Sequence, residues 1–171
     1  MVRTNLDGSF YATQAAARQM VSQSPSGGSI IGISSVSALV GGGQQAHYTP
    51  TKAGILSLMQ SCAVALGKHG IRCNALLPGT IKTQMNEADL SNDEKRIYME
   101  NRIPVGRTGV PEDLIGPAIF LASSLSQYVV SVRVQAYTSC YRQTDGVRLV
   151  HSCLLTAVCS SIYNSTLTNF W

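Results

Sequence analysis

Charged residues are scarce in this chain, since Asp, Glu, Lys and Arg make up only 13% of its 171 residues. The Lys and Arg residues are spread out and form no stripe interleaved with aromatic residues, which argues against a nucleic-acid-binding surface. No apolar run approaches the roughly 18 residues that cross a membrane. The opening MVRTNLDGSF lacks the charged-then-apolar pattern of a signal peptide. We therefore expect a cytoplasmic protein that binds neither nucleic acid nor membrane.

The cysteines lack the spacing that a disulfide framework or a metal site would need. There are five of them, an odd number, and no two form a C-x-x-C pair. They are Cys62, Cys73, Cys140, Cys153 and Cys159. We expect reduced and mostly buried thiols, as is usual in the cytosol, and no bound metal.

Apolar residues make up 44% of the sequence, which is enough for one domain with a hydrophobic core. Stretches with helical apolar spacing alternate with short β-branched runs, which are typical of strands buried on both faces. We expect helices at 10–21 and 50–66, strands at 30–33 and over IRCNALL, and a helix from Pro111 that Pro117 should bend. This order predicts an α/β fold, part of a parallel sheet with flanking crossover helices.

Two segments depart from this alternation. The segment from Lys82 to Val110 is polar and predicts only short helices, and seven of the nine acidic residues lie between Glu87 and Asp113. Residues 129–171 contain no Lys or Glu and show neither strand alternation nor a helical face. We therefore predict one structured region over 1–128 and a tail over 129–171 without an assigned fold.

The stretch HYTPTKAG places Tyr48 four residues before Lys52. Pro50 is tolerated only in the first turn of a helix, so the helix must begin near Tyr48. Residues four apart lie on one helical face, which brings Lys52 beside Tyr48. A phenol is a weak base at neutral pH, and an ammonium within about 4–6 Å favours its phenolate form. The pair predicts an acid/base centre, although tyrosine and lysine also occur at helical spacing by chance.

A serine follows the first predicted strand. Open parallel sheets bind ligands at the carboxyl ends of their strands, so the Ser35 hydroxyl could meet the Tyr48 phenol across a substrate. Ser34 and Ser37 are alternatives for this role, and each of the three could instead cap the strand end. A serine hydrolase that uses Ser34 or Ser35 with His47 is a weaker alternative, because no G-x-S-x-G elbow surrounds either serine.

Together, NLDGSF, IIGISSVSALVGGGQQAHYTPTK and IRCNALLPGTIKT resemble the second half of a short-chain dehydrogenase/reductase over roughly residues 1–128. Within that family, RTNLDGSFYATQ, HYTPTKAG and RIPVGRTGVPEDL are most similar to fungal dehydrogenases that oxidise L-rhamnose. The resemblance implies an oxidoreductase that uses NAD or NADP and transfers a hydride from a sugar hydroxyl, converting an aldose to its lactone. It also implies a partial Rossmann-like parallel sheet with flanking helices over 1–128, followed by a divergent tail, and a homo-oligomer in the full-length family.

The resemblance assigns roles to residues by position. Tyr48 would be the acid/base and would also contact the cofactor. Lys52 would assist Tyr48 and bind the nicotinamide ribose. Ser35 would hold the substrate oxygen, and Asn5 would keep a water in a proton relay behind Lys52. The family's Pro-Gly segment, which holds the nicotinamide, corresponds to Pro78, Gly79, Ile81 and Thr83. The polar segment that follows corresponds to the family's substrate-binding region.

The sequence departs from the family pattern in two places. The family's Gly-rich turn for the cofactor pyrophosphate, T-G-x-x-x-G-x-G, has no match here, and the residue that separates NAD from NADP is missing with it. The tail also diverges, since TDG at Thr144 to Gly146 lies too late for the family's last turn. We therefore expect a truncated form with weak dinucleotide binding and little turnover. The alternatives are a 3-oxoacyl or other carbonyl reductase of the family, and a non-catalytic fragment that self-associates or pairs with full-length relatives.

Overall fold

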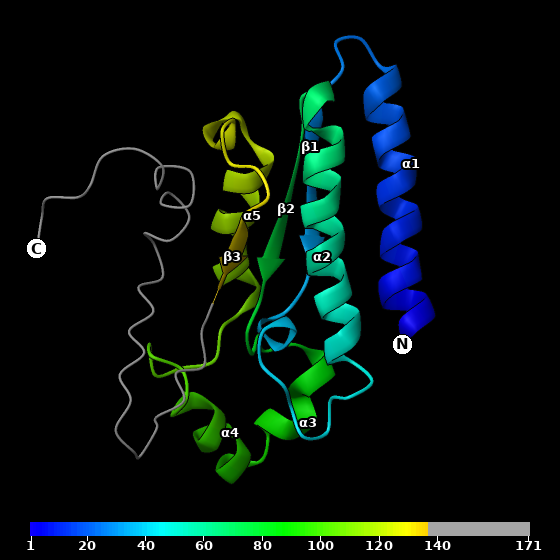
Figure 1. Cartoon of the computed structure of the whole chain (residues 1–171). Coiled ribbons are helices and arrows are strands. Elements are labelled where there is room, and N and C mark those ends of the chain that lie inside the picture. Colours follow the sequence, from blue (N-terminus) through cyan, green and yellow to red (C-terminus); the bar gives the residue numbers. More distant parts are fainter. Residues whose placement is uncertain (137–171) are drawn as a thin grey trace, which may run out of the picture. The chain divides into compact units, whose positions relative to one another are not determined.

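Three parallel strands form the sheet of this protein, seen here in a computed structural model that describes residues 1–136 (Figure 1). The strands are β1 (Gly28–Ile33), β2 (Ile71–Leu77) and β3 (Arg133–Gln135). Their order in the sheet is β1-β2-β3, and both pairings are parallel. Parallel neighbours require crossover connections, which the helices between the strands supply. The predicted α/β class with a parallel sheet is confirmed.

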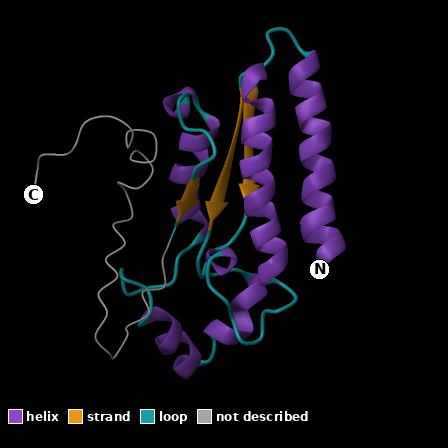
Figure 2. Ribbon diagram, in the orientation of Figure 1, coloured by secondary structure: helices purple, strands orange, loops and turns teal. Residues whose placement is uncertain are grey.

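Helices cover both faces of the sheet (Figure 2). They are α1 (Gly8–Ser22), α2 (Thr49–Leu66) and α5 (Ile115–Ala122). On the α1 and α2 side, Leu56 and Met59 of α2 join Cys73 and Leu77 of β2 in the main core cluster. On the α5 side, the Ser29 hydroxyl donates to the Leu121 carbonyl at 2.8 Å. Successive side chains of a strand point to opposite faces. The side chains on each face of this sheet therefore have a helix to pack against, as is usual for a parallel sheet.

The main elements lie where the sequence predicts them. The predicted helix at 50–66 is α2, which begins at Thr49 and has Pro50 in its first turn, where no N–H is needed. Strand β2 spans IRCNALL, as predicted. Strand β1 begins at Gly28, two residues before the predicted strand at 30–33. The last helix differs, because residues 111–114 form a 3₁₀ turn before α5. Pro117 then falls in the first turn of α5, where a proline is tolerated. The bend expected at Pro117 stays a prediction.

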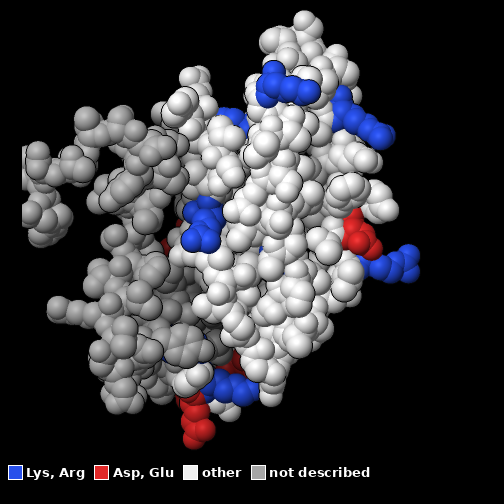
Figure 3. All heavy atoms as spheres, viewed as in Figure 1, with Lys and Arg blue, Asp and Glu red and all other residues white. Residues whose placement is uncertain are grey.

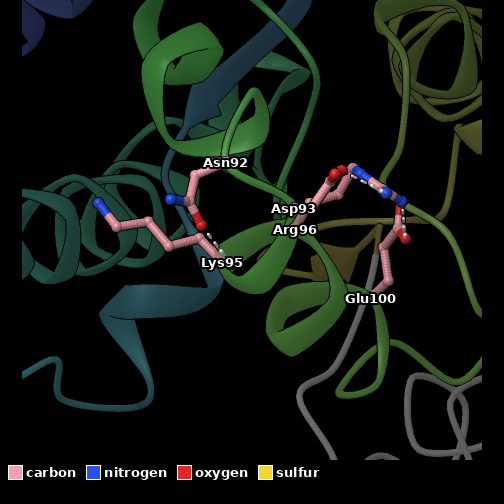
Figure 4. Close-up of polar contacts among 5 residues, drawn as sticks. All are labelled: Asn92, Asp93, Lys95, Arg96 and Glu100. Atoms are coloured by element: carbon pink, nitrogen blue, oxygen red, sulfur yellow. Dashed lines mark hydrogen bonds and ion pairs between the residues drawn. The ribbon is translucent and has the colours of Figure 1, made fainter.

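The polar segment after β2 forms the short helices that its composition predicts. They are a 3₁₀ turn at Gln84–Asn86, α3 (Glu87–Leu90) and α4 (Asp93–Glu100). None of the residues of α4 is buried, so its conformation depends on local polar contacts. Figure 4 shows them: Asn92 Oδ1 accepts from the Lys95 N–H at 3.0 Å, and Arg96 pairs with Asp93 at 2.8 Å and with Glu100 at 3.0 Å. Such exposed pairs contribute little to global stability.

Strand β3 lies inside the segment for which no fold was predicted. It pairs with the last three residues of β2, from Ala75 to Leu77. Residues 137–171 lie outside the described residues, so the boundary at residue 128 stays a prediction. Over the described range, no helix is both long and apolar enough to span a bilayer. On the face that Figure 3 shows, the Lys and Arg side chains are separated from one another.

Of the five cysteines, Cys62 and Cys73 lie within the described part of the chain, and both are free thiols. Cys73 is fully buried, and burial, aided by the neighbouring Cys62, raises the pKa of its thiol to about 11. We predict that iodoacetamide at about pH 8 leaves Cys73 unmodified in the folded chain, because the thiolate is the reactive form. Peptide mass mapping before and after unfolding in guanidinium would test this. Equal labelling of Cys73 in both states would contradict it.

Candidate active site

Tyr48 and Lys52 lie together at the start of α2. Tyr48 is the residue that precedes the helix, and Lys52 is one turn further along. The Lys52 ammonium nitrogen is 5.7 Å from the centroid of the Tyr48 ring. Both residues are half-buried. The spacing expected from the sequence is therefore realised, and the cation stands beside the phenol ring.

Asn5 reaches this site through a residue that the sequence did not point to, Thr51. Asn5 belongs to a short π-helical turn (Arg3–Asp7) that precedes α1. Its Nδ2 donates to the Thr51 hydroxyl at 3.1 Å, and that hydroxyl donates to the Tyr48 carbonyl at 2.7 Å. Thr51 is only 2% exposed, so these bonds are shielded from water. Asn5 and Thr51 thus hold the backbone from which the Tyr48 side chain projects.

The two serines at the end of β1 make different contacts. The Ser34 hydroxyl donates to the Lys52 carbonyl at 2.7 Å, which ties the strand end to the first turn of α2. Ser35 Oγ accepts from the Ser37 N–H at 3.1 Å and caps the following 3₁₀ turn. The hydroxyl of Ser34 is therefore occupied, which disfavours it as a nucleophile. The role of Ser35 toward a substrate stays a prediction.

The Lys52 amine is itself bonded to the protein. Its Nζ donates to the Ile33 carbonyl at 3.0 Å. Burial lowers the pKa of Lys52 below the ordinary value of 10.5, because desolvation penalises the ammonium. The amine thus gives up its proton more readily than a lysine in water.

This lowered pKa has a testable consequence for Lys52. In the folded chain the amine should lose its proton at a lower pH than in the unfolded chain, where 10.5 is expected. The unfolded chain then binds more protons in the window below that value, so the contribution of Lys52 to the free energy of unfolding rises with pH there. The pH titration of ¹³C-dimethyl-lysine NMR signals, with and without urea, would measure both midpoints. Equal midpoints for Lys52 would contradict the prediction.

The predicted nicotinamide segment follows β2 directly. Pro78 and Gly79 are half-buried, and the Pro78 carbonyl accepts from the Val36 N–H at 3.0 Å, which joins the ends of β1 and β2. Ile81 pairs with Gly109 in an isolated parallel bridge. The serine segment after β1 and the Pro-Gly segment after β2 therefore lie together at the carboxyl ends of the two strands.

Thr83 and the loop that carries Gly109 are held by side-chain contacts. The Thr83 N–H donates to Asn86 Oδ1 at 3.0 Å. On the other side, Arg107 pairs with Asp113 at 2.7 Å, and the Arg107 guanidinium holds the pKa of the Asp113 carboxyl well below its usual range. The roles of Pro78, Gly79, Ile81 and Thr83 toward a cofactor stay predictions.

A groove of about 450 Å³ opens beside the site. Its walls come from the π-helical turn and α1, from residues 30–33 of β1, and from α2. Asn5 and Lys52 line it, whereas Tyr48 and Ser35 do not. The groove therefore shares one side with the predicted proton relay.

Comparison with known proteins establishes the family of this chain. A family model described as "Enoyl-(Acyl carrier protein) reductase" matches residues 1–135. The chain belongs to the short-chain dehydrogenase/reductase family. This short-chain dehydrogenase/reductase is 71% identical over 128 residues to the L-rhamnose-1-dehydrogenase of Scheffersomyces stipitis, covering 75% of this chain and 49% of the relative. It is 63% identical to the L-rhamnose 1-dehydrogenase (NAD(P)(+)) of a Sphingomonas species, covering 74% of this chain and 50% of the relative.

Solved structures agree with this family and fold. The gluconate 5-dehydrogenase of Burkholderia cenocepacia, in complex with NADP and tartrate, has a TM-score of 0.75 and 34% sequence identity. The match covers 78% of this chain and 52% of that chain. This short-chain dehydrogenase/reductase spans about half the length of the curated relatives it matches.

Proposed function

We propose that this chain carries the proton-transfer half of an NAD(P)-dependent dehydrogenase that oxidises an aldose such as L-rhamnose to its lactone. The observation that carries the proposal is the Lys52 ammonium 5.7 Å from the Tyr48 ring centroid, with both backbones anchored by Asn5, Thr51 and Ser34. The 71% identity to an L-rhamnose-1-dehydrogenase supports the substrate class.

The residues of the site divide the reaction between them. The Tyr48 oxygen accepts the proton of the sugar hydroxyl as the carbon–oxygen double bond forms, and the Lys52 amine stands beside the Tyr48 ring, 5.7 Å from its centroid. Ser35 donates a hydrogen bond to the same sugar oxygen. Asn5 keeps a water behind Lys52 for the return of the proton. A nicotinamide cofactor, when bound, supplies the acceptor for the hydride that leaves the sugar carbon.

The residues present fit only the nicotinamide end of such a cofactor. Lys52, Ile81 and Thr83 offer an amine, a backbone amide and a hydroxyl at the ends of β1 and β2. The sequence contains no Gly-rich turn of the family type for the pyrophosphate, and the Lys52 amine is engaged by the Ile33 carbonyl. We therefore propose that this chain alone binds NAD or NADP weakly and has low activity.

One pair of assays tests the function. This chain and a version joined to the preceding segment of the Scheffersomyces stipitis enzyme are each supplied with NAD or NADP and a panel of aldoses. We expect NAD(P)H formation with L-rhamnose from the joined version and little from this chain. A folded joined version without aldose-dependent NAD(P)H formation would contradict the proposal.

A carbonyl reductase is the second candidate. The (3R)-3-hydroxyacyl-CoA dehydrogenase of mouse is 42% identical over 135 residues, so acyl substrates belong in the same panel. Reduction of a 3-oxoacyl thioester by the joined version, with no aldose oxidation, would favour this candidate. The third reading, a non-catalytic fragment that self-associates or pairs with full-length relatives, predicts an assembly without turnover, which light scattering would detect.

A further inference from the structure

Residues 80–82, which follow β2, lie directly beside Gly109. Ile81 and Gly109 form a parallel bridge. The Gly109 N–H donates to the Thr80 carbonyl at 3.0 Å, and the Lys82 N–H donates to the Gly109 carbonyl at 2.8 Å. A Cβ on residue 109 would come within 2.6 Å of Ile81 Cδ1, so the absence of a side chain there leaves room for the Ile81 side chain.

This bridge leaves the Ile81 N–H available to a ligand. In a parallel pair, one residue bonds to the two chain neighbours of its partner. Gly109 therefore bonds to the neighbours of Ile81, whose own N–H and carbonyl face away from it. The Ile81 carbonyl accepts from Asn86 Nδ2 at 2.9 Å, whereas the Ile81 N–H makes no hydrogen bond within residues 1–136. This N–H is therefore a donor that a carboxamide oxygen could accept from.

A pair of side chains holds Gly109 in place at this bridge. The Arg107 guanidinium makes two bonds to the Asp113 carboxylate, from Nη1 at 2.7 Å and from Nη2 at 2.9 Å. Arg107 Nη1 also donates to the Thr108 carbonyl at 3.0 Å. Asp113 Oδ2 accepts from the Val110 N–H at 2.8 Å. Both chain neighbours of Gly109 are thus bonded to this pair, which we call the Arg107–Asp113 clasp.

Global stability does not account for the clasp. The Arg107 and Asp113 side chains are 57% and 36% exposed, and exposed ion pairs contribute little to the free energy of unfolding. Arg96 forms a similar pair with Asp93, but both of those residues belong to α4. The clasp instead fixes a loop whose backbone bonds to the segment after β2. A guanidinium and a carboxylate that pair through two bonds have a defined mutual geometry, which suits such a positioning role.

We propose that Arg107 and Asp113 are positioning residues for the nicotinamide of the cofactor. Their clasp holds Gly109 against residues 80–82 and thereby aims the Ile81 N–H at the carboxamide oxygen. The nicotinamide step rests on the proposed function, whereas the action of the clasp on residues 80–82 does not. Neither side chain contacts the cofactor in this arrangement, so loss of the clasp should weaken nicotinamide binding without removing a binding group.

Amide hydrogen exchange in this whole chain tests the clasp. Arg107→Gln removes both the charge and the paired donors of the guanidinium. We expect the amides of Lys82 and Gly109 to exchange about tenfold faster or more in this variant, because the loop opens more often. Arg107→Lys keeps the charge but lacks the planar guanidinium, so its rates should fall between those of Arg107→Gln and the unsubstituted chain.

Arg96→Gln is the matched control for the exchange measurement. It removes an arginine from an exposed pair on α4 and should leave exchange at Lys82 and Gly109 unchanged. The midpoint of urea unfolding should be nearly the same in all three variants, because both pairs are exposed. Unchanged exchange in Arg107→Gln, or an equal acceleration in Arg96→Gln, would overturn the clasp.

Nicotinamide mononucleotide, the half of the cofactor that the residues present fit, tests the positioning role. The NMR amide signals of Ile81 and Thr83 are followed while this chain is titrated with the mononucleotide at millimolar concentrations. We expect the Ile81 signal to move, and Arg107→Gln to weaken the affinity by about tenfold. Adenosine monophosphate, which carries a ribose phosphate without the nicotinamide, should leave the Ile81 signal in place.

The outcomes separate this proposal from the proposed function. Equal affinities of Arg107→Gln and the unsubstituted chain would overturn the positioning role and leave the proposed function standing. Binding that depends on Arg107, together with no aldose oxidation by the joined version, would leave the positioning role standing and overturn the proposed function. An Ile81 signal that does not move with nicotinamide mononucleotide would overturn both.

Discussion

Replacing Tyr48 by Phe in the version joined to the Scheffersomyces stipitis segment should lower kcat by about 10²–10⁴-fold, the usual contribution of a positioned acid/base. The phenylalanine ring keeps the contact with the Lys52 amine, which lies 5.7 Å from the ring centroid in this chain. Only the hydroxyl to which we assign the substrate proton is lost. Because the ring of residue 48 is kept, cofactor affinity should change little.

A second tyrosine provides the control for this measurement. Tyr11 is 65% exposed on α1, and Tyr11→Phe removes a hydroxyl of the same kind without touching the start of α2. Steady-state rates and NAD(P) titration by fluorescence should show Tyr11→Phe unchanged in both. Full activity of Tyr48→Phe would remove the mechanism, and loss of cofactor binding together with activity would show that the hydroxyl acts in binding.

The sequence predicts those parts of the site whose cause is local. The i, i+4 spacing of Tyr48 and Lys52, with Pro50 fixing where the helix begins, is sufficient to bring the two side chains together. The β-branched run at Ile30 and Ile31 is sufficient to predict a strand, because short β-branched runs are typical of strands. The expected burial on both faces is not found, since no residue of β1 is buried in this chain.

The anchors of the site could not be predicted in the same way, because they depend on contacts between distant segments. Thr51 is bonded to Asn5, 46 residues earlier, and Ser34 to Lys52, 18 residues later. The position of Thr51 between Tyr48 and Lys52 could have marked its hydroxyl as part of the site. The neighbouring sequence does not indicate, however, that Asn5 is the donor to that hydroxyl. The bond from the Lys52 amine to the Ile33 carbonyl likewise joins residues 19 positions apart in the sequence.

Strand β3 escaped prediction for a related reason. Three residues are too few for a periodic pattern by themselves, although Val130, Val132 and Val134 do alternate with polar residues in VVSVRVQ. The alternation is short and was not recognised. What fixes it is a polar side chain in the middle of an apolar strand. Asn74 of β2 is fully buried, and its Nδ2 donates to the Val129 carbonyl at 2.9 Å while its Oδ1 accepts from the Val132 N–H at 2.9 Å. Asn74 thus holds the turn that leads into β3.

Replacing Asn74 by Ala should therefore lower the free energy of unfolding by about 1–3 kcal/mol, since it leaves a part-buried carbonyl and a part-buried N–H without their partners. Asn101→Ala is the control, because Asn101 is exposed and the same atoms are removed there in contact with water. Urea unfolding would measure both changes, and hydrogen exchange at Val132 and Val134 would show whether β3 is loosened first. A midpoint for Asn74→Ala equal to that of the control would mean that β3 is held by the sheet alone. In the Asn74→Ala variant, the amides of β3 should exchange before those of β2. A three-residue strand makes few backbone hydrogen bonds, and the variant also lacks the two bonds of the Asn74 side chain.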